Sequence, residues 1–163
     1  MLEPMDECCC AGAQDDVDSA TCTRCHTTGK PVDELTVKAL LIGSALARFD
    51  PGAYRFCPDA DCDIVYFAEH GGTFSKSDLR VTVWQKEPMG SRMLCYCFGE
   101  TDTTIAGEIA GTGASHAAER IRAHIKAGRC ACAVRNPRGV CCLGDVNVAV
   151  ERMLQGHTTK SKQ

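Results

Sequence analysis

The chain has 163 residues, of which 44% are apolar and 24% charged, so its length suits one globular domain or two small ones. Aromatic residues make up only 6% of it, whereas 13 residues are cysteine, which indicates that small hydrophobic cores are supplemented by sulfur-based links. The formal net charge is −3 and no basic stripe stands out, so nucleic acid is excluded as an expected partner.

The compartment decides whether these cysteines form disulfides or bind metals. Residues 1–16 are acidic and lack the apolar stretch of a secretory signal, and the longest apolar stretch, 37–49, is interrupted by charged and small residues. We therefore expect a cytoplasmic protein without membrane insertion, in which thiols stay reduced. There, closely spaced cysteine pairs indicate metal sites, and an odd number of cysteines argues against a complete disulfide set.

Residues 1–19 are expected to form a disordered tail that carries three consecutive cysteines, Cys8, Cys9 and Cys10. Thiolates favour soft ions such as Cu(I), but consecutive side chains do not easily converge on one ion. The pattern leaves two interpretations open, a hook for a soft metal or an uncommitted, oxidisable tail.

A first cysteine group spans two short motifs. Cys22 and Cys25 form C-x₂-C, and Cys57 and Cys62 form C-x₄-C, with a predicted helix over 36–49 and a strand over 54–57 between them. This pattern is typical of a structural, tetrahedral zinc site. A rubredoxin-type iron would use the same ligands, but zinc is favoured because it needs no redox machinery and stabilises small folds. His26 is expected to face solvent rather than replace a thiolate.

The rest of the chain divides into strands and then helices. Strands are predicted over 64–67 and 81–85, residues 86–91 have the composition of a linker, and helices are predicted from about 102 to 111, from 115 to 127 and from 143 to 154. The expected fold class is α+β, with a small zinc-bound α/β module followed by an all-helical module. The predicted boundaries are 1–19 for the tail, 20–88 and 89–155 for the two modules, and 156–163 for a loose polar end.

A second cysteine group encloses the predicted helices of the second module. Cys95 and Cys97 form C-x-C, and further thiols return at Cys130, Cys132 and the Cys141-Cys142 pair. A C-x-C loop suits a [2Fe–2S] cluster, in which each iron takes two protein sulfurs, better than it suits a single zinc ion. The thiols precede or begin helices, whose N-termini favour negative charge. Spacing alone leaves open which later thiols bind the cluster.

These motifs resemble a known family. Cys95-Tyr96-Cys97 followed by helices and a later cysteine pair resembles the bacterioferritin-associated-ferredoxin-like (BFD-like) [2Fe–2S] domain. Together with the first cysteine group and the segments 56–67 and 136–142, it resembles the N-terminal region of CopZ-type copper chaperones over residues 20 to about 150. The resemblance implies the following cluster ligands: Cys95, Cys97, Cys132 and Cys142. It implies the following zinc ligands: Cys22, Cys25, Cys57 and Cys62.

The resemblance also implies a function in copper homeostasis. Conventional enzyme catalysis is not expected, because the five histidines are scattered and none pairs with a nucleophile. The cluster would transfer single electrons, reducing Cu(II) to Cu(I), and Cys130 and Cys141 would be spare thiols able to receive Cu⁺. The expected partners are a soft metal ion and a copper-transport or redox protein. The heavy-metal-associated domain of such chaperones, with its own C-x-x-C, is not expected within these residues. Two alternatives remain, an iron–sulfur redox-sensing or regulatory binding module and a structural protein with two zinc ions.

Overall fold

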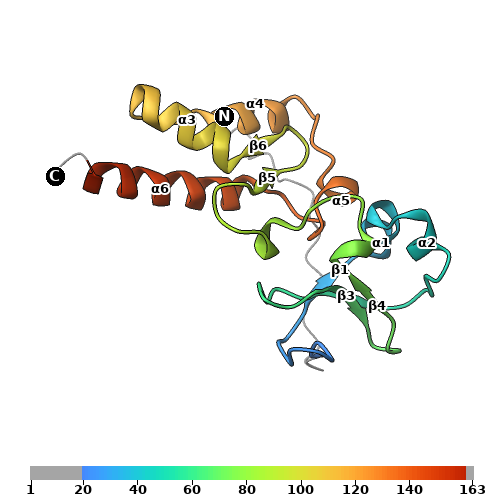
Figure 1. Ribbon diagram of the computed structural model, residues 1–163. Helices are drawn as coiled ribbons and strands as arrows, with labels where there is room; N and C mark the ends of the chain where they lie inside the picture. The colour runs from blue at the N-terminus through green and yellow to red at the C-terminus, as the bar shows by residue number, and fades with distance from the viewer. Residues whose placement is uncertain (1–19, 161–163) are drawn as a thin grey trace, which may run out of the picture.

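The computed structural model describes residues 20–160, which form an α+β fold, as predicted. Figure 1 shows a small sheet beside short helices in one region and longer helices in the other. The Cys8–Cys10 motif lies outside the described residues. Of the helices that are described, none is long and apolar enough to cross a membrane.

The first region is a four-stranded antiparallel sheet in the order β1-β2-β3-β4, with helices α1 and α2 beside it. Its elements have these bounds: β1 (Lys30–Val32), α1 (Glu34–Leu40), α2 (Gly43–Leu46), β2 (Tyr54–Phe56), β3 (Ile64–Ala68), β4 (Thr73–Ser75) and the 3-10 turns η1 (Lys76–Asp78) and η2 (Trp84–Lys86). Strand β3 consists mostly of branched and aromatic residues. This composition suits its position, because its last four side chains are all buried. The core of this region includes Val37, Leu41, Phe56, Tyr66 and Phe74.

Two predictions for this region are wrong in detail. The helix expected over 36–49 is broken, because Leu41 takes an extended conformation and pairs with Leu79 in an isolated bridge. As a result Leu46, which helical spacing over 36–49 would place on the inward face with Val37 and Leu41, is 38% exposed. The strand expected over 81–85 is absent from the described fold, because residues 84–86 form η2 instead. Local alternation of apolar residues predicted a strand there, but no neighbouring strand pairs with it.

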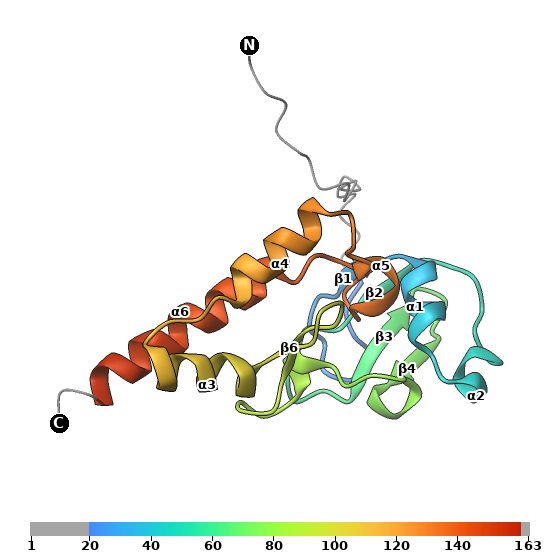
Figure 2. The ribbon, with the colours of Figure 1, turned by 90° about the horizontal axis from the view of Figure 1, so that it is seen from above.

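The second region packs two helices against a third. Its elements have these bounds: β5 (Met93–Cys95), β6 (Glu100–Thr101), α3 (Asp102–Thr112), α4 (Ala117–Lys126), α5 (Cys132–Arg135) and α6 (Leu143–Lys160). Helices α3 and α4 lie against α6 in both views (Figures 1 and 2), and Ile105, Ile109, Ile121 and Val146 fill the space between them. The region is not all-helical as predicted, because β5 and β6 form an antiparallel pair around the C-x-C loop. Helix α6 also continues six residues past its predicted end at residue 154.

The segment that resembles a linker is anchored at both ends. Lys86 is only 7% exposed and donates from Nζ to the carbonyl oxygens of Asp59 (2.6 Å) and Cys62 (2.9 Å) in the first region. At the other end, the buried Arg92 and Asp102 form a two-pronged ion pair, with Nε to Oδ2 at 2.7 Å and Nη2 to Oδ1 at 3.1 Å. Residues 86–92 are therefore held at one end by the first region and at the other end by the second.

Candidate metal centres

The first cysteine group converges at one end of the sheet. The Sγ atoms of Cys22, Cys25, Cys57 and Cys62 all lie within 4.8 Å of one another. Cys22 and Cys62 are 3.9 Å apart and Cys25 and Cys57 are 3.5 Å apart. Four sulfurs placed tetrahedrally around zinc at about 2.3 Å are separated by about 3.8 Å. The donor set and its geometry therefore fit a single zinc ion.

Two turns present these thiols. The Cys22–Cys25 turn closes through the Cys22 N–H to the Thr27 carbonyl (2.9 Å) and the His26 N–H to the Cys22 carbonyl (2.8 Å). His26 has φ = 59° and an exposed side chain, so it turns the chain while pointing to solvent, as predicted. Next to this turn, glycine is required at position 29, because a Cβ there would lie 2.4 Å from the Phe67 ring.

The burial of these thiols favours a bound cation. Burial raises the pKa of the Cys57 and Cys62 thiols, because a thiolate is poorly solvated there. Burial also acts to raise the pKa of Cys25, but hydrogen bonds from Thr27 and neighbouring thiols outweigh it and lower that pKa to about 7. A dication would compensate the buried negative charge and release the remaining protons. Lys86, which no local motif predicted, adds a buried positive charge next to the Cys57–Cys62 loop.

The second cysteine group forms a chain of contacts rather than a compact tetrahedron. Cys97 and Cys132 have their Sγ atoms 3.8 Å apart, and Cys142 hydrogen-bonds to both Cys95 and Cys132. The structure thus brings all four predicted cluster ligands together from the C-x-C loop, the start of α5 and the residue before α6. An elongated set of four thiols fits a two-iron cluster, in which the ligands divide between two metal atoms.

The surplus cysteines lie at the edge of this group. Cys141 also hydrogen-bonds to Cys132. Cys130, which precedes Cys132 by two residues, is half-buried. Sequence spacing could not choose among these neighbours. The structure places Cys142 at the centre of the contacts, with 2% of its surface exposed, because Cys142 precedes α6 and points toward the core.

Protons in the second cysteine group are shared through Cys142. The pKa of Cys142 is raised because its thiol donates to the thiolates of Cys132 and Cys95 and is buried as well. The same hydrogen bonds lower the pKa of Cys95 to about 7 and that of Cys132 to about 6. Burial raises the pKa of Cys97 to about 11, although its sulfur accepts the Ala131 N–H at 3.3 Å. Low-pKa thiols are preformed metal ligands.

The loops that carry these thiols are fixed by backbone hydrogen bonds. Gly99, with φ = 74°, closes the C-x-C loop by donating its N–H to the Cys95 carbonyl at 2.9 Å. Asn136 is 1% exposed, donates from Nδ2 to the Val140 carbonyl (2.8 Å) and accepts the Arg138 N–H (3.0 Å). The sequence showed the Asn136–Gly139 stretch only as a turn. The structure shows that Asn136 holds the loop that presents Cys141 and Cys142.

Comparison with known proteins supports the zinc-binding part of this arrangement. The family zf_CopZ, described as a zinc binding domain, matches residues 19–80. The crystal structure of the Archaeoglobus fulgidus CopZ N-terminal domain superposes with a TM-score of 0.62 and 31% sequence identity, covering 76% of this chain and 92% of that one. The chain belongs to the family of CopZ N-terminal domains. The zinc interpretation of the first cysteine group is thereby supported by both geometry and family.

This chain matches only part of a longer relative. The Archaeoglobus fulgidus protein named copper chaperone CopZ is 32% identical over 121 residues, which are 74% of this chain. The matched part is 57% of that relative's length, so the chain spans less than two thirds of it.

Proposed function

We propose that this protein handles copper by electron transfer, with a [2Fe–2S] cluster on Cys95, Cys97, Cys132 and Cys142 and a structural zinc on the first cysteine group. The convergence of those four thiols from three separate segments is the observation that carries the proposal. When bound, such a cluster exchanges one electron at a time, which is the change that converts Cu(II) to Cu(I). Copper is the substrate here, and the BFD-like character of the second region belongs to the same proposal.

The residues around the thiols suit this role. The Ala131 N–H donates to the Cys97 sulfur, and hydrogen bonds to ligand sulfurs raise the reduction potential of iron–sulfur centres. Cys97 and Cys132 are half-buried whereas Cys95 and Cys142 are buried, so one side of the group approaches the surface. Cys130 and Cys141 are half-buried as well and neighbour Cys132 and Cys142 in the chain, and they would take up Cu(I), because soft ions prefer thiolates.

The cellular role follows from the same chemistry. We propose a cytoplasmic protein that is an accessory metal reductase rather than a conventional enzyme, and that works with a copper-transport or redox partner. The curated relative bears the name copper chaperone, which is consistent with this proposal. Reduced thiols and a thiolate-bound cluster are compatible with that compartment.

Anaerobic purification with metal analysis and spectroscopy tests the proposal. Iron and zinc in a ratio of about 2:1, with visible absorption that bleaches on dithionite and an EPR signal from the reduced state, are expected for these two sites. The Cys142→Ser variant should lose the iron and the colour, whereas the matched control Cys130→Ser should keep both. Stopped-flow mixing of reduced protein with Cu(II) should restore the oxidised spectrum. Protein that contains zinc but no iron would overturn the proposal.

One contact favours a second candidate, a redox-sensing or regulatory module. The buried Tyr66 hydroxyl of β3 donates to the Pro137 carbonyl at 2.7 Å, so the zinc-bound sheet touches the loop that presents Cys142. Loss of a cluster would loosen that loop and change the surface that a partner meets. Hydrogen exchange before and after oxygen exposure separates the two functions. Protection that changes at Tyr66 as the colour fades favours regulation, and unchanged protection favours electron transfer alone.

A further inference from the structure

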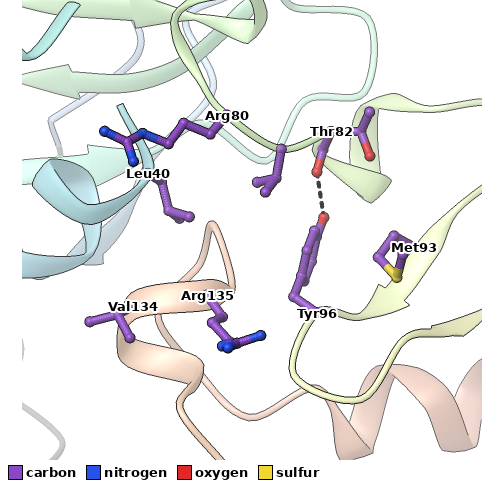
Figure 3. Close-up of a pocket in the computed structure, with 8 residues that line it drawn as sticks. Leu40, Arg80, Thr82, Met93, Tyr96, Val134 and Arg135 are labelled. Atoms are coloured by element: carbon purple, nitrogen blue, oxygen red, sulfur yellow. Dashed lines mark hydrogen bonds between the residues drawn. The ribbon is translucent and has the colours of Figure 1, made fainter. Parts of the chain in front are cut away.

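A cavity opens between the first region and the C-x-C loop (Figure 3). Its volume of about 380 Å³ lies within the range typical of small-molecule sites. Most of its wall is apolar, and none of the described residues that line it is acidic. The apolar wall consists of Leu40, Val81, Met93, Tyr96 and Val134.

Tyr96 makes the cavity a neighbour of the proposed cluster. It stands between Cys95 and Cys97 in the chain, and its hydroxyl donates to the Thr82 carbonyl at 2.7 Å and accepts the Trp84 N–H at 3.0 Å. These two hydrogen bonds fix the position of the phenol ring. A molecule in contact with this ring would touch the residue that joins two proposed cluster ligands, Cys95 and Cys97, in the chain.

Positive charge at the cavity is unpaired. Figure 3 shows the Arg135 side chain extending from α5 toward Tyr96, and Arg80 on the opposite side of the cavity beside Leu40. Arg80 donates from Nε to the Leu41 carbonyl at 2.8 Å, but within residues 20–160 neither arginine forms an ion pair. A guanidinium at the rim of an apolar cavity suits a ligand that combines an apolar ring with an anionic group.

We propose that this cavity binds a planar aromatic electron carrier that bears an anionic group, and that the carrier exchanges electrons with the cluster. The ring would lie against Tyr96 and the anionic group would pair with Arg135. In the step itself the reduced carrier loses one electron and the oxidised cluster gains it, without any bond being made or broken. The electron-transfer part rests on the proposed function, whereas the binding part does not. Phosphorylated flavins and quinone sulfonates share the required chemistry.

FMN and riboflavin provide a matched pair of probes, because they share one ring system and differ by a phosphate. Quenching of flavin fluorescence on titration with the oxidised protein measures both dissociation constants. We expect FMN to bind about 5–10-fold more tightly than riboflavin, which corresponds to about 1–1.4 kcal/mol. Arg135→Gln should remove most of this preference. The control Arg122→Gln makes the same charge change at an exposed site on α4 and should leave it intact.

A second variant tests the cavity itself. Val134 is 39% exposed at the rim, so Val134→Trp can fill the cavity without disturbing a buried core. It should weaken binding of both flavins at least tenfold and slow reduction of the cluster by photoreduced FMN, while reduction by dithionite is unchanged.

The outcomes separate this inference from the proposed function. Protein that contains iron and is reduced by dithionite, but binds FMN and riboflavin equally, overturns the cavity proposal alone. Equal effects of the Arg135 and Arg122 substitutions overturn it as well. Protein without iron overturns the proposed function together with the electron-transfer part, whatever its affinity for FMN.

Discussion

The two cysteine groups use the same number of thiols but arrange them differently. In the first, four sulfurs surround one point, each within 4.8 Å of the others, and two short turns at one end of a sheet supply them. In the second, contacts run from Cys95 through Cys142 and Cys132 to Cys97, and three distant segments supply the thiols. A compact tetrahedron fits one closed-shell ion, whereas an extended set fits a cluster with two metal atoms.

The comparison also shows how each region obtains its stability. The first region has a sheet of short strands, and we expect it to need zinc to join its turns, as small domains often need a metal. The second has an apolar helix interface and a buried ion pair between Arg92 and Asp102. We therefore expect removal of a metal ligand and removal of a buried charge to affect different halves of the molecule.

The largest expected effect is loss of the zinc site. Cys57→Ser replaces a fully buried thiol ligand, and structural zinc contributes about 10–16 kcal/mol to the folding of zinc-finger peptides. The variant should lose its zinc and the thermal transition of the sheet. Metal content per chain and circular dichroism measure both quantities. Retained zinc and an unchanged melting temperature would show that the first group does not depend on all four thiols.

Breaking the buried ion pair should come next. Asp102→Asn leaves the Arg92 guanidinium, whose side chain is 9% exposed, without its anionic partner. Removing one member of a buried pair typically costs about 3–5 kcal/mol. Urea unfolding should show this loss, and hydrogen exchange should locate it in α3 and the β5–β6 pair. The control Asp61→Asn, at an exposed aspartate of the first region, should be nearly neutral. Equal effects of the two substitutions would mean that the Arg92–Asp102 pair adds nothing to the free energy of unfolding.

Lys86 tests whether the linker-like segment supports the zinc site. Lys86→Met removes two hydrogen bonds from a buried ammonium group to the Asp59 and Cys62 carbonyls. We expect a loss of about 1.5–3 kcal/mol and faster release of zinc to a chelator. Absorbance of a zinc-sensitive dye follows the release. The exposed Lys126→Met variant on α4 serves as the control, and identical release rates would argue against the predicted support.

The smallest expected effect concerns pH. Hydrogen bonds from Ser115 and Arg120 lower the pKa of Glu108 to about 2. Because the folded-state pKa lies below the unfolded one, this carboxylate stabilises the fold above about pH 4.5, and the contribution disappears as the pH falls toward 2. The Arg120 side chain is 41% exposed, so we expect about 1 kcal/mol or less at pH 7. Urea titrations of Glu108→Gln should therefore differ from the unsubstituted protein at pH 7 and converge with it near pH 2. A constant difference would contradict the assignment.

Much of the helical region could be predicted from sequence. Ile105 and Ile109 stand four residues apart on one predicted helix, and the structure buries both, because the periodicity of a helix is a local property. The same reasoning failed over 36–49, where Leu41 leaves the helix to pair with Leu79. A contact across 38 residues overrides local propensity, and it leaves no local signal.

The sequence by itself determined which side chains could bind metal. C-x₂-C and C-x₄-C fix each pair of thiols in one turn, so a four-thiolate metal site follows from spacing, although spacing does not separate zinc from a rubredoxin-type iron. Only the tertiary structure decided how the second group meets, since Cys95, Cys132 and Cys142 approach one another through the packing of α5 and α6 around the C-x-C loop. It likewise decided that Lys86 supports the zinc loop and that Tyr96 faces a cavity. Such contacts join residues far apart in the chain, and only folding brings those residues together.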